Sequence, residues 1–126
     1  MGPFPSPAQD YVERRISLDE QLIRSPSSTY FMRAGQSYWR AGIMKDALLV
    51  VDSGVRACEG SIVICAIAGE FTLRRIRFSR STVLERLDDP LKCDDLSELD
   101  ESGVFGVVIY IINDARSDEF DDCPVM

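Results

Sequence analysis

Short runs of aliphatic, β-branched and aromatic residues, set apart by Gly, Ser, Asp or Pro, dominate the chain after residue 28. Each run has about five to nine residues, and this length and composition are typical of β-strands. The predicted strands cover residues 29–33, 47–51, 61–67, 70–78, 82–87 and 104–112. The last run is apolar almost throughout, which predicts a strand at the centre of the core or in a subunit interface. The chain is therefore expected to be mainly β.

Two local signals add a short helix and a hairpin. Ser17 and Glu20 have the spacing of a capping box, in which each side chain satisfies a free amide at a helix start. Pro26 then ends this helix, so it can only be short. Only Ala68 and Gly69 separate two of the predicted strands, which indicates a tight hairpin.

The ends of the chain differ from its centre. Three prolines in the first ten residues favour an extended start, and residues 88–96 form an acidic stretch typical of a solvated loop. Residues 114–126 are polar, acidic and expected to be disordered. We therefore predict an extended arm over residues 1–16, one β-rich domain over 17–113 and an acidic tail over 114–126.

The composition excludes several catalytic mechanisms. The 126 residues include no histidine and, among 14 basic residues, only two lysines, Lys45 and Lys92. Ser-His-Asp and Cys-His catalysis and His-containing zinc sites are therefore impossible. The four cysteines lie too far apart in sequence for a C-x-x-C pair or a zinc knuckle. We expect reduced thiols, no cofactor and no metal.

The charge is distributed unevenly. The net charge is −7, but residues 1–84 hold eleven basic and eight acidic side chains, whereas residues 85–126 hold three and thirteen. Such a balance argues against direct, sequence-specific nucleic-acid binding and against an anionic membrane as a partner. The sequence shows neither a signal peptide nor a run long enough to span a bilayer, so we expect a cytoplasmic protein.

Several segments, in order, resemble the UmuD and LexA family of self-cleaving serine peptidases. The matching segments are Phe4 to Ile16, Ser25 to Phe31, Ala34 to Ser37, Leu48 to Ser53, Gly69 to Thr72, and Val104 to Ile109. The resemblance implies a LexA/UmuD-like peptidase-domain fold of twisted, mostly antiparallel sheets with a short amino-terminal helix. It also implies a dyad in which an uncharged lysine activates a serine, which needs no histidine.

In this resemblance the nucleophile position falls on Ser37 and the lysine position on Arg74. A guanidinium group has a pKa above about 12 and no free lone pair, so it cannot take the serine proton. Neither Lys45 nor Lys92 lies on the matching strand. The resemblance thus implies a vestigial peptidase site. We therefore favour a protein that is not an enzyme.

Three interpretations of the arginines on this strand remain open. Strand alternation places Arg74 on the face of apolar neighbours, where it fills the lysine site and bonds Ser37 or a backbone carbonyl. Alternatively, the arginines line a solvated strand, or they form a basic strip that faces DNA, although no stacking aromatics accompany them. The residues concerned are Arg74, Arg75, Arg77 and Arg80.

The start of the chain lies close to the glycine at which UmuD removes its own amino-terminal arm. The expectation is therefore a protein already in the processed form, without a cleavable arm. The resemblance further implies homodimers formed through the last predicted strand. The residues expected in this interface are Val104, Phe105, Val107 and Ile109.

Three functions follow from the resemblance. The first is an accessory subunit of an error-prone translesion DNA polymerase in the SOS response, which binds a UmuC-type polymerase and the RecA filament, as in DNA polymerase V. The second is an active peptidase that uses Ser37. The third is an interaction or inhibitory module that forms mixed dimers with a host UmuD-type protein.

Overall fold

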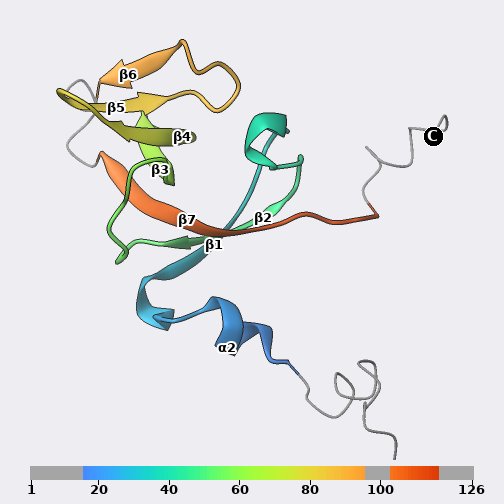
Figure 1. Cartoon of the computed structure of the whole chain (residues 1–126). Helices are drawn as coiled ribbons and strands as arrows, with labels where there is room; N and C mark the ends of the chain where they lie inside the picture. The colour runs from blue at the N-terminus through green and yellow to red at the C-terminus, as the bar shows by residue number, and fades with distance from the viewer. Residues whose placement is uncertain (1–15, 96–102, 117–126) are drawn as a thin grey trace, which may run out of the picture.

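The computed structural model describes residues 16–95 and 103–116. In these residues seven strands form one antiparallel sheet with the order β1-β2-β7-β3-β4-β5-β6. Figure 1 shows the strong twist between the lower strands and the upper strands. The strands are β1 (Thr29–Arg33), β2 (Leu48–Asp52), β3 (Ile62–Ile67), β4 (Glu70–Phe78), β5 (Thr82–Glu85), β6 (Cys93–Asp95) and β7 (Val104–Ile112). The predicted mainly β, antiparallel fold is confirmed.

The predicted short helix is present as α2 (Leu18–Leu22). Ser17 is its N-cap, and the Ser17 hydroxyl accepts a hydrogen bond from the Glu20 amide at 3.5 Å. Two short 3-10 turns follow, η1 (Pro26–Ser28) and η2 (Trp39–Ala41). Proline at the start of η1 separates the helix from β1, as the sequence predicted.

The strand prediction was wrong in one place. The acidic stretch expected to be only a solvated loop contains β6, which pairs with β5. Aspartate is depleted in strands, so composition gave no sign of this pairing. β6 lies at the edge of the sheet, where backbone hydrogen bonds to one neighbour are enough to form a strand.

The predicted hairpin joins β3 and β4. Its turn consists of Ala68 and Gly69, with φ angles of 51° and 80°, and Ile67 pairs with Glu70 across the turn. Positive φ at both central positions is the geometry of a type I′ turn, whose twist matches that of the strands. The turn therefore fixes the register between β3 and β4, in which Arg74 pairs with Val63.

Strand β7 runs through the centre of the sheet, between β2 and β3. Gly106 of β7 lies so close to β2 that a Cβ there would come within 2.8 Å of Val51 Cγ1. The register shifts between Val50 and Val51 on one side of β7, and between Ile64 and Cys65 on the other. The apolar run is thus a core strand, as its pattern predicted.

The core consists of two clusters of buried side chains. The first cluster contains Ala34, Ile43, Ala47, Leu49, Val51, Ile64, Leu73 and Leu87. The second contains Val63, Cys65, Ile76, Leu84 and Val107. Because successive strand residues point to opposite faces, Leu73 and Ile76 of β4 contribute to different clusters. Strand β4 is therefore packed on both sides along its middle.

Candidate functional site

Ser37 lies in the loop between β1 and β2. Its Oγ accepts a hydrogen bond from the backbone N–H of Lys45 at 2.9 Å. Tyr38 and Ile43 exchange two backbone hydrogen bonds, of 2.7 and 3.2 Å, around the η2 turn. Gly42 closes the turn with a φ of 73°, a left-handed conformation that favours glycine. The loop that presents Ser37 is therefore held by its own backbone.

A residue from the other end of the chain also holds this loop. The Asn113 side chain, directly after β7, accepts a hydrogen bond from the Met44 amide and donates one to the Gly42 carbonyl, both at 2.9 Å. Sequence reasoning missed Asn113, because nothing local marks a polar residue after a strand as the partner of a loop 70 residues earlier. The contact is visible only once the sheet order places β7 beside β2.

Arg74 lies in the middle of β4 and pairs with Val63 of β3. Its side chain is half-buried, and Nη1 donates a hydrogen bond to the carbonyl oxygen of Leu73 at 2.8 Å. The backbone carbonyl was one of the two partners expected for this guanidinium. The strand position predicted for the lysine is therefore occupied by a side chain that cannot act as a base.

A pocket of about 410 Å³ joins the Ser37 loop to strand β4. The residues flanking Ser37 and the residues preceding Arg74 both contribute to its wall, so the pocket lies between the two segments that carry the predicted positions. Figure 1 shows the η2 loop rising beside β4. The lining residues are Met32, Arg33, Ala34, Gly35, Gln36, Tyr38, Leu49, Ile64, Phe71, Thr72 and Leu73.

Both lysines of the chain lie in connections before or between strands. Lys45 is exposed, and its backbone amide donates a hydrogen bond to Ser37 Oγ. Lys92 lies on the connection between β5 and β6, where its carbonyl accepts from the Arg86 amide. Neither residue belongs to β4. Within residues 16–95 and 103–116 no group of His, Cys, Asp and Glu side chains has the arrangement of a metal site.

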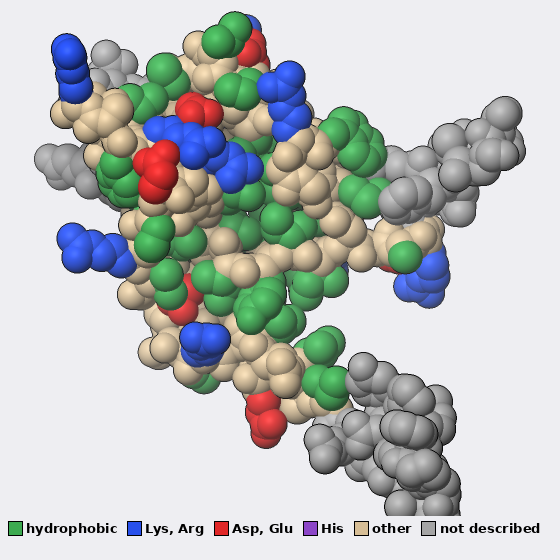
Figure 2. All heavy atoms as spheres, in the orientation of Figure 1, with side chains coloured by type: hydrophobic (Ala, Val, Ile, Leu, Met, Phe, Trp, Pro, Cys, Tyr) green, Lys and Arg blue, Asp and Glu red, His purple; other side chains and the backbone are tan. Residues whose placement is uncertain are grey.

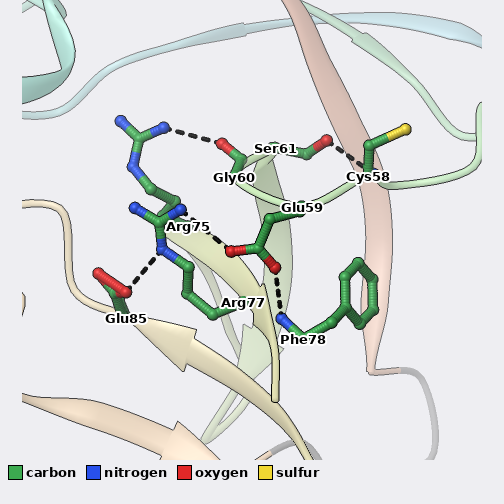
Figure 3. A network of polar contacts seen from close by, with 8 residues as sticks. All are labelled: Cys58, Glu59, Gly60, Ser61, Arg75, Arg77, Phe78 and Glu85. Atoms are coloured by element: carbon green, nitrogen blue, oxygen red, sulfur yellow. Dashed lines mark hydrogen bonds and ion pairs between the residues drawn. The ribbon is translucent and has the colours of Figure 1, made fainter.

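Two of the arginines that follow Arg74, Arg75 and Arg77, bind the protein itself (Figure 3). Arg75 donates to the Gly60 carbonyl at 2.8 Å. Arg77 donates to Glu85 at 2.8 Å and to Glu59 at 3.2 Å. Figure 2 shows basic and acidic side chains meeting over β4 and β5. These contacts tie the loop between β2 and β3 to β4, and they favour a structural role over a strip that faces DNA.

This network shifts the pKa values of Glu59 and Arg77. The backbone amide of Phe78, which donates to Glu59 at 2.7 Å, lowers the pKa of Glu59, and Arg77 lowers it further. Conversely, Glu85 first and then Glu59 raise the pKa of Arg77. The positive charge of Arg77 is stabilised by the carboxylates of Glu59 and Glu85. The network is therefore strongest when both of these carboxyl groups are ionised.

The residues predicted for a dimer interface pack inside the monomer. Val107 is buried in the second core cluster, and Val104 and Ile109 pack against it. Phe105 packs against the first cluster, and its ring lies 5.1 Å from that of Tyr30 and 5.2 Å from that of Phe71. Their role in a dimer stays a prediction.

Comparisons with known proteins agree with the resemblance. The Peptidase S24-like family profile matches residues 1–109. The ImpA protein of Salmonella typhimurium is 39% identical over 114 residues, which cover 90% of this chain and 78% of ImpA. The SamA protein of Salmonella typhimurium is 36% identical over 115 residues, which cover 90% of this chain and 80% of SamA.

Two further relatives extend the comparison. The MucA protein of Escherichia coli is 45% identical over 74 residues, which cover 58% of this chain and 51% of MucA. The LexA repressor of Thiobacillus denitrificans is 30% identical over 118 residues, covering 90% of this chain and 58% of the repressor. Among the described residues, no helix is both long and apolar enough to cross a bilayer. The chain therefore belongs to the Peptidase S24-like family, as a UmuD-like member.

Proposed function

We propose that this protein is a UmuD′-like accessory subunit of an error-prone translesion DNA polymerase in SOS mutagenesis, and that it does not cleave peptides. The carrying observation is Arg74, which occupies the family's lysine position on β4, beside the pocket that the Ser37 loop forms. The serine position is kept and held in place, but a guanidinium cannot remove its proton. The proposed role is therefore binding, in the cytoplasm, with the chemistry left to the polymerase.

The proposal that the peptidase lacks its general base can be tested by introducing a lysine with the substitution Arg74→Lys. The purified protein is incubated with a RecA–single-stranded DNA filament and an UmuD-type substrate that carries its cleavable arm. We expect no cleavage by the parent and cleavage by Arg74→Lys, because a lysine there can lose its proton on burial. Adding Ser37→Ala to that variant is expected to abolish the gain. Arg75→Lys, the neighbouring change on the same strand, serves as the control and is expected to remain inactive.

The second candidate is an active peptidase that uses Ser37. It is favoured by the intact pocket and by the ordered loop around Ser37. If the parent protein cleaves the substrate and Ser37→Ala abolishes that cleavage, the second candidate replaces the first.

The partners proposed for the first function are a UmuC-type polymerase and the RecA filament. Copurification of the full chain with such a polymerase, followed by a lesion-bypass assay with and without the chain, tests this role. We expect a stable complex and bypass that depends on it. Mixed dimers with a host UmuD-type protein, without any gain in bypass, would instead identify an inhibitory module.

The proposed homodimer is supported by exposed apolar side chains of β1 and of the second half of β7. Phe31, Tyr110 and Ile112 are 52%, 39% and 37% exposed, and a small groove runs between Ile112 and helix α2. Figure 2 shows hydrophobic side chains at the surface over these lower elements. Exposed apolar groups in one area favour association. This patch extends the interface predicted from Val104, Phe105, Val107 and Ile109, which the monomer itself largely covers.

A charge placed in this patch tests the dimer. Ile112→Asp is expected to shift the chain from dimer to monomer in sedimentation equilibrium, because a carboxylate would be buried against an apolar surface. Leu91→Asp is the matched control, since Leu91 is 93% exposed in the connection between β5 and β6. Equal dimerisation of the parent and Ile112→Asp would place the interface elsewhere.

A further inference from the structure

The two edges of the sheet differ in how they are protected. Strands β1 and β6 lie at opposite ends of the sheet, and each pairs with one neighbour (Figure 1). Proteins commonly protect an edge with a short strand or with charged residues. β6 has both features, because it has three residues and two of them are aspartates. β1 has five residues, no proline and no acidic residue, and its one charge is at its last position, Arg33. β1 is therefore the edge that is open to a further strand.

The hydrogen bonds at the two ends of β1 show which backbone groups face this edge. The carbonyl of Ser28 accepts from the amide of Ser53 at 2.9 Å, and the amide of Ala34 donates to the carbonyl of Ala47 at 3.0 Å. In an antiparallel pair, residues bonded to the neighbouring strand alternate with residues whose N–H and C=O groups point away from it. The backbone groups of the even-numbered residues of β1 therefore point to β2, and those of the odd-numbered residues point to the edge.

Two of these edge residues have backbone groups that another strand could bind. The amide of Thr29 already donates to the carbonyl of Pro26. Within residues 16–95 and 103–116, Phe31 and Arg33 form no backbone hydrogen bond outside the pairing of β1 with β2. β2 is also the one described element that packs extensively along β1. The edge of β1 thus presents the amides and carbonyls of Phe31 and Arg33.

The sequence of β1 is complementary to itself in one antiparallel register. A two-fold axis at Phe31 places this residue opposite Phe31 of a second copy. The same axis places Tyr30 opposite Met32, an aromatic ring beside a thioether, which is a favourable pair. It also places Thr29 opposite Arg33, so no like charges meet. A two-fold axis at Arg33 would instead bring two guanidinium groups together, which is destabilising.

Side chains on both faces of β1 have apolar surface left to bury. Phe31 is 52% exposed and Tyr30 is 45% exposed. Since successive strand residues point to opposite faces, these two rings lie on opposite sides of the sheet. The Tyr30 ring packs against Phe105, with centroids 5.1 Å apart, so one of the two faces is already ordered for contact. Pairing at this edge therefore buries aromatic surface on both faces.

We propose that two copies of the chain associate by antiparallel pairing of their β1 strands about Phe31, which joins two seven-stranded sheets into one. In this dimer Phe31 exchanges backbone hydrogen bonds with Phe31 of the second copy, and the Arg33 amide donates to the Thr29 carbonyl. The interface is isologous, because both copies contribute the same strand. This inference rests on the homodimer proposed above and assigns its contact to the edge of β1.

Amide hydrogen exchange tests the interface without any substitution. Sedimentation equilibrium of the full chain first establishes the concentrations at which the dimer forms. NMR-detected exchange is then measured below and above that range. We expect the amides of Phe31 and Arg33 to exchange at least about tenfold more slowly in the dimer, because pairing shields them from water. The amides of Tyr30 and Met32, which are bonded to β2, are the internal control and should be protected already in the monomer.

A charge placed opposite Arg33 tests the register. Thr29→Lys is expected to weaken dimerisation by about fivefold or more, because each dimer contains the repulsive pair twice. Adding Arg33→Glu to that variant should restore the affinity, since each lysine then faces a carboxylate. Thr82→Lys, the same change at the first residue of β5, is the matched control and is expected to leave dimerisation unchanged.

The possible results separate this inference from the homodimer itself. A chain that stays monomeric contradicts both. A dimer in which the Phe31 and Arg33 amides exchange as they do in the monomer overturns the β1 interface alone. Equal dimerisation of the parent and Thr29→Lys, or no recovery with Arg33→Glu, overturns the register. Polymers that grow with concentration would also overturn the proposal, because pairing of β1 with β6 of the next copy does not close.

Discussion

The side chain of Asn113 holds the backbone of Met44, 69 residues earlier, through a 2.9 Å hydrogen bond from the Met44 amide. The same side chain donates to the Gly42 carbonyl. Since Ser37 is bonded to the next residue, Lys45, the end of β7 helps to position the whole loop around the serine. The central strand and the candidate site are therefore parts of one structural unit.

Asn113→Ala is expected to destabilise the protein by about 1–3 kcal/mol, because it leaves the amide of buried Met44 without its partner. Urea unfolding measures the free energy, and hydrogen exchange of the Tyr38 and Ile43 amides reports on the loop. Asn113→Asp is the matched control: it keeps an acceptor for Met44 but loses the donor to Gly42, so its loss should be smaller. Equal losses in both variants would contradict the assigned role of the Met44 bond.

The hairpin turn offers a stabilising substitution. Ala68 has a φ of 51°, a left-handed conformation that strains a residue with a Cβ, whereas asparagine tolerates it and favours this turn type. Ala68→Asn is therefore expected to increase the free energy of unfolding by about 0.5–1 kcal/mol. Urea or thermal unfolding measures the change. Ala68→Val, which cannot adopt this conformation easily, should have the opposite effect, and stabilisation by valine would contradict the explanation.

The sequence predicted those parts of the fold that depend on local patterns. The strands over residues 70–78 and 104–112 were predicted with the observed bounds, because both runs are rich in β-branched, aliphatic or aromatic residues and lie between a glycine and a polar residue. β6 was missed, since its formation depends on pairing with β5 rather than on its own acidic residues. Local propensity therefore works where side chains determine the strand and fails where a neighbouring strand does.

The candidate site likewise contains residues that could be predicted from the sequence and residues that could not. Ser37 and Arg74 were found by resemblance, and the fold places their flanking residues around one pocket. Asn113 could not be found, because its two partners lie in a distant loop that only the strand order brings near. The buried Asp52 is similar: its carboxylate binds the Ser28 hydroxyl at 2.7 Å, a contact that no spacing in the sequence suggests.

Close strand packing makes Gly106 sensitive to the addition of a single methyl group. A Cβ at this position would lie 2.8 Å from Val51 Cγ1 and 3.2 Å from the Asp52 carbonyl, and the backbone cannot move away easily within a central strand. Gly106→Ala is expected to cost about 1–3 kcal/mol, as overpacked cores usually do. Chemical unfolding measures the loss. Adding Val51→Ala should recover part of it by removing the clashing methyl groups, and no recovery would contradict the steric explanation.

The Glu59 network predicts a dependence of stability on pH. Hydrogen bonds from Phe78 and Arg77 lower the pKa of Glu59 from its ordinary value of 4.5. A carboxyl group with a lower pKa in the folded state stabilises that state above the unfolded pKa, and the contribution is lost as the pH falls through the folded pKa. We therefore expect Glu59→Gln to be less stable than the parent at pH 7, and the difference to shrink as the pH falls below about 4.5.

Glu70→Gln, the same charge change at the exposed start of β4, is the control and should show a smaller difference. Unfolding curves collected from pH 7 to pH 3 measure both variants, and a Glu59→Gln deficit that grows toward low pH would contradict the network.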